Sequence, residues 1–376
     1  MRSRGVGRIR QRARGVGPGP FATALRSWAT RRPADRRGSH VTVVETVLGP
    51  VEADVLGPTL LHEHLQINLW PWFETGGASG DLRVGPETMA AVRANPFAVR
   101  DNLILDDLDL AAAELAPFAA VGGRTVVDLT LPEIGRAPES LRALATKTGL
   151  NIVMGCGRYI AAARPRELEG APAELLRDEL LHDLLDGVDG SGVRAGVIGE
   201  IGTSDPLHPD EARMLWAAAE AQAQTGRGLV IHLDPWGRNG HAVLDHALGA
   251  GADPARTMLA HLDPSITDLS YARSLAGRGV TVAIDIWGDE DAYGGRGMPT
   301  DEARIRAVLD AFDQGWADRL ALSQDVCLKS QLRIHGGPGY AHILEVIAPR
   351  LRAAGLRDTD INLLMIDTPR RLLAGA

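Results

Sequence analysis

The chain has few cysteines and no long apolar segment. Two cysteines, Cys156 and Cys327, among 376 residues cannot build a disulfide framework, which disfavours a disulfide-stabilised secreted class and suits a reducing cytosol. No run of 18 apolar residues occurs, so the sequence predicts no transmembrane helix. Because 45% of the residues are hydrophobic, the chain can bury a large core, and we expect a soluble cytoplasmic protein.

Lysine is also scarce, since two residues, Lys147 and Lys329, stand against 38 arginines. Eleven of these arginines lie in residues 1–40 beside a single Asp, so this segment carries about +10 and the rest of the chain about −18. An acidic body argues against nucleic-acid binding. We therefore expect a small-molecule substrate, and neither a nucleic acid nor a membrane as partner.

Residues 1–40 are rich in Arg, Gly and Pro and show no helical or strand period, which predicts a disordered tail. Three other interpretations stay open: a transit peptide, an anion-binding arm, and a reading frame extended upstream of a true start near Val41 or Val43. A twin-arginine export signal is disfavoured because no apolar segment follows Arg31 and Arg32.

From residue 53 onward, short apolar runs alternate with segments of helical periodicity. The helical spacing is clearest in DEARMLWAAAEAQAQTG, which Pro209 can open and Gly226 can end. The residues on its shared face are Met214, Leu215, Ala218, Ala221 and Thr225. The eight runs predicted as strands span residues 56–65, 124–131, 150–159, 193–204, 228–234, 257–263, 280–288 and 320–326.

Strands that alternate with helices predict a parallel sheet, and eight such units match an α/β fold of the (β/α)8 TIM-barrel type. No GxGxxG follows the first strand, so a dinucleotide-binding fold lacks support. The predicted barrel domain spans residues 41–376. The connection over residues 66–100 is an insertion, and a loop of that length in a compact domain is typically functional or disordered.

Polar residues stand at the C-terminal ends of the predicted strands, where TIM barrels place their active sites. In LLHEHL the two histidines are two residues apart, so in a strand both imidazoles point to the same face. The residues at these ends are His62 and His64 in the first strand, Glu200 in the fourth, His232 in the fifth, His261 in the sixth and Asp325 in the eighth. One such residue alone is more often a satisfied core polar group, but six at one end of one barrel indicate a shared site.

Four imidazoles and two carboxylates suffice to hold two divalent metal ions about 3.5–4 Å apart, the spacing used by dinuclear hydrolases. Nitrogen-rich ligation favours zinc, with manganese, cobalt, iron or nickel as alternatives. The sequence thus predicts a binuclear metal centre at the C-terminal ends of the strands. No GxSxG is present, so a covalent serine hydrolase lacks support.

Several motifs together resemble the phosphotriesterase-related branch of the amidohydrolase superfamily. They are HEHL, IGEIGTS, the fifth-strand IH, AHLD and LSQDV, joined by GCGRY and HGGPGYAHIL, and the similarity covers about residues 43–375. The resemblance implies a binuclear-metal barrel that hydrolyses esters, lactones, phosphotriesters or related bonds, and it suggests a homodimer.

The resemblance also implies a role for each ligand. His62 and His64 would hold the more buried metal, and His232 and His261 the more exposed one. Asp325 would bind the buried metal and accept a proton from the bridging hydroxide.

Many members of this family bridge the metals with a carboxylated lysine on the fourth strand. Neither lysine of this chain lies there, so Glu200 is expected to bridge, as in a glutamate-bearing subgroup that the chain resembles more closely. This departure lowers the expectation of efficient phosphotriesterase activity.

Aromatic residues make up 4% of the chain, yet seven of the 16 fall in or beside predicted loops on the catalytic side, which predicts an apolar substrate wall. They are Trp70, Trp72, Phe73, Tyr159, Trp236, Trp287 and Tyr293. By resemblance to related lactonases, Tyr159 is expected to orient or polarise the scissile carbonyl. Ordinary loop packing is the alternative for each of them.

Charged residues near the predicted barrel mouth are further candidates. Lys329 is expected either to bind a substrate carboxylate, phosphate or sulfonate or to be a solvated surface residue. Arg158, Arg238 and His335 are weaker candidates of the same kind. Asp263 follows the sixth-strand histidine and is expected to orient a ligand or to bind substrate.

The function predicted first is hydrolysis of a lactone or carboxylic ester. Hydrolysis of an amide or carbamate in an anionic substrate is the alternative within the same chemistry, with phosphotriesterase activity at most a side activity. From another class, a metal-stabilised binding protein without turnover also fits the ligand set.

Overall fold

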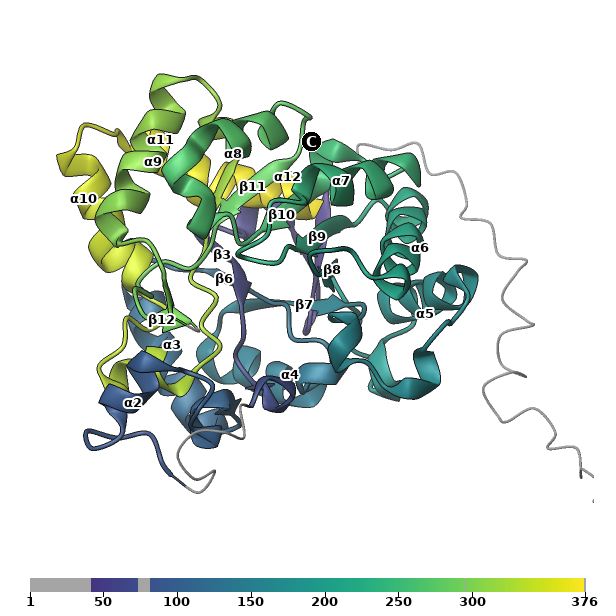
Figure 1. Cartoon of the computed structure of the whole chain (residues 1–376), viewed down its shortest axis with the longest axis horizontal. Coiled ribbons are helices and arrows are strands. Elements are labelled where there is room, and N and C mark those ends of the chain that lie inside the picture. The colour runs from purple at the N-terminus through teal and green to yellow at the C-terminus, as the bar shows by residue number, and fades with distance from the viewer. Residues whose placement is uncertain (1–41, 74–81, 294, 375–376) are drawn as a thin grey trace, which may run out of the picture. The chain divides into compact units, whose positions relative to one another are not determined.

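A computed structural model describes residues 42–73, 82–293 and 295–374, so the predicted tail over residues 1–40 lies outside the described residues. Eight parallel strands follow one another in chain order around one sheet (Figure 1). They are β3 (Thr59–Glu63), β6 (Thr125–Asp128), β7 (Asn151–Cys156), β8 (Val197–Gly202), β9 (Gly228–His232), β10 (Thr257–Ala260), β11 (Thr281–Ile284) and β14 (Leu320–Leu322). Each lies within one of the eight predicted runs, and the predicted TIM-barrel fold is confirmed.

The barrel closes where its first strand meets its last. The ladder runs from β3 to β14, and at the remaining gap the Asp325 amide donates to the His62 carbonyl at 3.0 Å. Glu63, the residue between the two histidines of LLHEHL, points to the other side of the strand. Its carboxylate accepts hydrogen bonds from the amides of Gln324 (2.8 Å) and Val326 (2.9 Å). Side-chain bonds from Glu63 therefore join the two strands.

Helices follow the strands and cover the outside of the barrel (Figure 1). They are α3 (Leu108–Ala120), α4 (Pro138–Thr148), α5 (Ala173–Leu185), α6 (Pro209–Thr225), α7 (Gly240–Gly249), α8 (Leu269–Ala276) and α9 (Asp301–Asp313), with α10 (Ala348–Ala353), α11 (Asp358–Asn362) and α12 (Thr368–Ala374) at the end of the chain. In α6, Pro209 occupies the first turn and Gly226 ends the helix at φ 67°, as predicted. None of the described helices combines the length and apolar character needed to span a bilayer.

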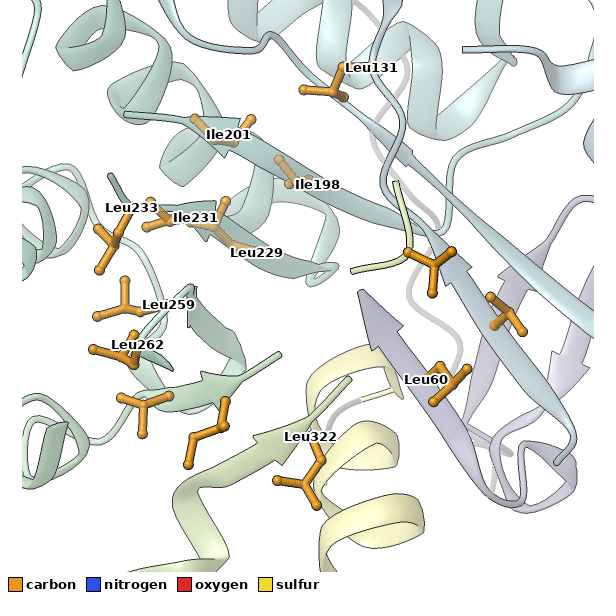
Figure 2. Packing of buried hydrophobic residues seen from close by; sticks show 14 of the residues in the cluster. Leu60, Leu131, Ile198, Ile201, Leu229, Ile231, Leu233, Leu259, Leu262 and Leu322 are labelled. Atoms are coloured by element: carbon orange, nitrogen blue, oxygen red, sulfur yellow. The ribbon is translucent and has the colours of Figure 1, made fainter. Parts of the chain in front are cut away.

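Neighbouring residues of one strand pack into two separate apolar layers. On β3, Leu60 belongs to the layer between strands and helices, whereas Leu61 belongs to the layer inside the barrel. Figure 2 shows part of the outer layer, where Ile198 of β8 and Ile231 of β9 lie among leucines from the neighbouring strands. This alternation is the period of two that strands impose. It is interrupted where the pairing register shifts, between Leu60 and Glu63 of β3 and between Ile198 and Ile201 of β8, and these are the segments that carry His62 and Glu200.

Three short strand pairs lie outside the barrel sheet in the described chain. β4 (Ile67–Asn68) pairs with β5 (Ile104–Leu105) and so brings the two ends of the predicted insertion together. The described part of the insertion also holds the short helix α2 (Met89–Ala94). After β11, β12 (Ala292–Tyr293) pairs with β13 (Arg296–Gly297), and at the start of the described chain β1 (Val43–Thr46) pairs with β2 (Gly49–Glu52).

Candidate metal centre and active-site cavity

The structure brings together the six residues predicted as metal ligands at the ends of five strands. Two of the three residue groups that could hold a metal ion share Glu200, and the four histidines and Glu200 are buried. The three groups are His62 with His64 and Glu200, Glu200 with His232 and His261, and His62 with His261 and Asp285. Asp325 is the most accessible of the six, with 16% of its side chain exposed. It adopts φ 48°, a left-handed backbone conformation that Asp and Asn tolerate better than most residues.

The first group contains His62, His64 and Glu200, and Asp325 lies beside it. The Nε2 atom of His62 lies 3.3 Å from Glu200 Oε2 and 3.6 Å from Asp325 Oδ1. The Nε2 atom of His64 lies 3.2 Å from Asp325 Oδ1 and 3.6 Å from Glu200 Oε1. The buried Nε2 atom of His62 makes no hydrogen bond to any described residue. Since a buried nitrogen without a partner is costly, this donor set fits a divalent cation.

The second group contains Glu200, His232 and His261. Glu200 Oε2 lies 2.8 Å from His232 Nδ1 and 3.7 Å from His261 Nε2, and these two nitrogens are 2.9 Å apart. Three atoms of metal-ligand type within this distance of one another fit a second cation. Because Glu200 belongs to both groups, its carboxylate has the position required of a bridge.

Asp285, at the end of β11, supports both groups and was missed by the sequence interpretation. Its Oδ2 lies 2.9 Å from His62 Nδ1, and its Oδ1 accepts a hydrogen bond from the His261 amide at 2.9 Å. The Nδ1 atom of His64 is held in the same way by Thr130 at 2.9 Å. Occupied Nδ1 atoms leave the Nε2 atoms of both histidines free to bind metal. The signal was present, since Asp285 stands at a strand end like the six ligands.

Two carboxylates of the site, Glu200 and Asp285, are held in their charged form. Burial raises the pKa of Glu200, but the imidazoles of His62 and His232 outweigh this effect and keep it well below its usual range. Burial likewise raises the pKa of Asp285, and His261 and His62 lower it further than burial raises it. Ionised carboxylates are the form that binds a metal ion and orients an imidazole.

Asp263 lies behind Asp285, away from the cavity. It accepts a hydrogen bond from the Asp285 amide at 2.9 Å and pairs with the buried Arg304 at 2.6 Å. Asp263 therefore positions Asp285, which in turn orients two ligand histidines. The predicted contact between Asp263 and a substrate is not supported by its position. Asp128 is similarly structural, because it accepts from the amides of Leu65 (2.7 Å) and Thr130 (3.0 Å).

A cavity of about 210 Å³ opens onto the two groups. Its apolar wall comes from the insertion and from the loops after several strands: Ile67, Leu69, Trp72, Phe97, Ile134, Tyr159, Trp236, Ile286, Tyr293, Met298 and Leu328. The Tyr159 ring meets His232 edge-on with centroids 5.1 Å apart, and it meets Trp72 in the same way at 6.4 Å. Three of the predicted substrate residues, Trp72, Tyr159 and Trp236, thus lie together at the cavity.

Two other predicted substrate residues lie away from this cavity. Trp287 is fully buried in the core, where its indole nitrogen donates to the Ile284 carbonyl at 3.0 Å. Trp70 is 46% exposed, stacks on Phe73 and carries the guanidinium of Arg100 at 4.3 Å from its ring centre. Sequence position placed both in loops on the catalytic side, but it did not fix the direction of either side chain.

Lys329 also does not line the cavity, because its ammonium group pairs with Asp101 at 2.7 Å. The adjacent Ser330 amide donates to Asn102 at 2.8 Å, so the loop after β14 is tied to the end of the insertion. Lys329 therefore holds two loops together at the barrel mouth, and the predicted grip on a substrate anion is not supported by its position.

The weaker cationic candidates are engaged elsewhere or lie apart from the cavity. Arg158 pairs with Glu133 at 3.0 Å and with Glu179. Arg238 pairs with Asp268 at 2.7 Å. His335 is half-buried and is not among the residues that line the cavity.

The ion pair of Lys329 predicts a pH-dependent contribution to stability. Burial raises the pKa of Asp101, but hydrogen bonds from Lys329, the Val84 amide and Arg83 outweigh burial and hold it at about 2. A carboxyl group whose pKa is lowered in the folded state stabilises the fold at pH values above its pKa in the unfolded chain, which is near 4. This stability is lost as the pH falls toward 2. We expect Asp101→Asn to cost about 1 kcal/mol at pH 6, after allowance for solvent screening, and almost nothing near pH 2.

Urea unfolding of both proteins at pH 6, 4 and 2.5 measures this difference. The control Asp109→Asn removes an exposed carboxylate that pairs with Lys147, and it should change stability little at any of the three pH values. A cost of Asp101→Asn that stays constant from pH 6 to pH 2.5 would contradict the assignment.

The family model for the phosphotriesterase family matches residues 42–373, nearly all of the described chain. The chain belongs to the phosphotriesterase family. As a member it is a metal-dependent hydrolase, as the strand-end motifs predicted.

Three relatives show the range of this family. The chain is 33% identical to the N-acetyltaurine hydrolase of Xenopus tropicalis, a match covering 88% of this chain and 97% of the relative. The structure of a resiniferatoxin-binding protein from Rhodobacter sphaeroides is 40% identical, has a TM-score of 0.86 and covers 89% of this chain and 96% of that one. A mutant of a PTE-like lactonase from Deinococcus radiodurans is 30% identical, with a TM-score of 0.70 and coverage of 88% and 99%.

Proposed function

We propose that the protein hydrolyses a lactone or carboxylic ester with an apolar, non-anionic body, using two divalent cations. The observation that carries this proposal is the cavity, whose wall is mainly aromatic and aliphatic and opens directly onto the shared carboxylate Glu200. No Lys or Arg of the described residues lines it. A pocket of this kind favours an uncharged substrate over an anion.

Each cation would be held by the residues of one group. His62, His64 and Asp325 would hold the first, His232 and His261 the second, and Glu200 would bridge them. Zinc suits a nitrogen-rich set of this kind best. When bound, two such ions lower the pKa of a shared water and polarise the carbonyl oxygen of the substrate.

The chain's own groups position the substrate and move the proton. Asp325 is the partly exposed carboxylate of the site, so it can accept a proton on the cavity side and return it to the leaving group. Tyr159 packs against His232 and lines the cavity, which places it to orient the substrate carbonyl. The apolar wall keeps bulk water from the reacting groups.

The test of this function is proton release at constant pH from the zinc- or manganese-loaded protein. The substrates are unphosphorylated lactones of varied ring size and chain length, together with matched aryl esters. Rapid release from lactones or esters with long apolar substituents supports the proposal. No release from any of them, with two metal ions bound per chain, would refute it.

A second candidate function is hydrolysis of an amide in an anionic N-acyl substrate. It is favoured by the relatives named N-acetyltaurine hydrolase, which are 33% to 34% identical to this chain. The absence of a described cation from the cavity wall argues against it. Release of taurine from N-acetyltaurine, measured beside the lactone panel, separates the two candidates.

The bridging position of Glu200 predicts a loss of metal in its absence. Because Glu200 Oε2 serves both groups, Glu200→Ala removes a ligand from each site, and we expect metal content after dialysis to fall from two ions per chain to one or none. Elemental analysis of the dialysed protein measures this. The control Glu220→Ala, which removes a surface carboxylate paired with Arg177, should retain two ions. Two tightly held ions in Glu200→Ala would show that this residue is not the bridge.

A further inference from the structure

We propose that Asp234 determines substrate specificity by attracting an ammonium group on the apolar body of the substrate and repelling anions. This inference rests on the proposed ester or lactone hydrolysis and names the charge of the substrate away from the reacting bond. The loop after β9 carries Asp234 to the cavity, two residues beyond the ligand His232.

The turn that holds Asp234 uses one oxygen of its carboxylate. Oδ1 accepts hydrogen bonds from the amides of Trp236 at 2.9 Å and Gly237 at 2.8 Å. Oδ2 has no hydrogen-bond or ion-pair partner within the described ranges. The side chain is therefore fixed in place by its own loop, while one oxygen stays free to accept a donor from a ligand.

The charge of Asp234 is not compensated by the cations around its loop. Arg238 pairs with Asp268 instead, at 2.7 Å. Arg296 places its guanidinium 5.5 Å from the ring centre of Trp236 and makes no ion pair with Asp234 in the described structure. The other two carboxylates of the cavity, Glu200 and Asp325, face imidazole nitrogens and the proposed cations.

A free carboxylate beside aromatic rings is the chemistry that recognises an organic ammonium ion. Charges interact more strongly in a cavity with an apolar wall than in bulk water, because the effective dielectric constant is lower. Tyr159 adds an aromatic ring, whose face attracts cations, whereas Arg296 already lies over the ring of Trp236. An anionic group at the same place would meet an unpaired negative charge and lose binding.

The test compares the binding of three probes that share one apolar body and differ in charge: one cation, one neutral molecule and one anion. They are 3-phenylpropylammonium, 3-phenylpropanol and 3-phenylpropane-1-sulfonate, titrated into the zinc-loaded full chain and followed by calorimetry. We expect the wild type to bind the ammonium most tightly and the sulfonate most weakly. In Asp234→Asn the amide oxygen still accepts from the two turn amides, so the loop is preserved and only the charge is lost.

The decisive quantity is the ratio of the sulfonate and ammonium dissociation constants. We expect Asp234→Asn to lower this ratio at least tenfold, and a smaller change overturns the proposal. Any direct affinity of the sulfonate for zinc is the same in both proteins and cancels. The control Asp245→Asn removes an exposed carboxylate that pairs with Arg278 outside the cavity, and it should leave the ratio within twofold of the wild type. If the Asn variant fails to fold, Asp234→Ser, whose hydroxyl also accepts from the turn, decides in its place.

The binding measurement and the hydrolysis assay can fail independently. A loaded protein that hydrolyses no ester or lactone but shows the tenfold change in ratio refutes the proposed function and retains the role of Asp234 in binding. A protein that hydrolyses lactones but shows no change in ratio retains the proposed function and loses the role of Asp234.

Discussion

Asp325→Asn is expected to lower kcat for the best lactone or ester substrate about 1,000-fold while two metal ions stay bound. Transfer of a proton by a positioned side chain contributes typically about 100- to 10,000-fold to a rate, and an amide cannot take up that proton near neutral pH. The amide oxygen keeps the shape of the ligand, so metal binding should survive. Initial rates and elemental analysis of the same preparation measure both quantities.

The backbone makes asparagine the suitable replacement. Asp325 has φ 48°, a conformation that asparagine tolerates, and its amide must still donate to the His62 carbonyl at 3.0 Å. Asp245→Asn is a control, since it alters an exposed carboxylate that pairs with Arg278 at 2.7 Å and lies outside the cavity. A kcat of Asp325→Asn within tenfold of the wild-type value would contradict the assignment of Asp325 as the proton acceptor.

Arg304→Met is expected to lower the free energy of unfolding by about 3–5 kcal/mol, because it removes one partner of a buried charge network. The side chain of Arg304 is fully buried. It donates to Asp263 at 2.6 Å, to Asp301 at 3.0 Å and to the Asp289 carbonyl at 2.8 Å. Methionine fills a similar volume but removes the charged donor that each of these three acceptors receives from Arg304.

Removal of Arg304 is also expected to weaken metal binding. Burial raises the pKa of Asp263 to about 6 even though Arg304 lowers it, so loss of Arg304 is expected to raise this pKa further and to favour the protonated carboxyl. Protonated Asp263 holds the Asp285 amide less well, and Asp285 orients His62 and His261. We therefore expect zinc affinity to fall about 10-fold or more, as is typical when support of a ligand is lost.

Chemical unfolding and competition with a zinc chelator measure the two effects of Arg304→Met. Arg306→Met on the same helix removes an exposed cation and should change stability by less than about 0.5 kcal/mol. Arg304→Lys should fall between them, because a lysine keeps the charge but cannot reach three acceptors at once. A cost of Arg304→Met below that of Arg306→Met would contradict the network.

The strands and the ligand set were predictable because both depend on local pattern. Each barrel strand is a short apolar run, and each ligand is a polar residue directly after such a run, as His232 is after GLVI. Strand order in a TIM barrel follows chain order, so residues at equivalent ends must meet. Asp285 satisfied the same rule and was overlooked only because its run continues with apolar residues, IW.

The loop residues were less predictable because their partners are distant in sequence. Lys329 is neutralised by Asp101, 228 positions earlier, and no local signal reveals that pairing. Trp287 and Trp236 both follow strands, yet one turns into the core and the other lines the cavity. The direction of a loop side chain is set by tertiary contacts. The periods of two residues for a strand and 3.6 residues for a helix carry no information about it.

The contact between β3 and β14 determines when, during synthesis of the chain, the barrel can close. His62 lies on the first barrel strand and Asp325 directly after the last, and side chains such as Glu63 close the gap between them. Translation delivers these strands more than 250 positions apart. A nascent chain therefore has its histidines long before it has a complete metal site. The predicted site of His62, His64 and Asp325 cannot be complete before β14 has been made, and a chain truncated before β14 keeps an open sheet edge.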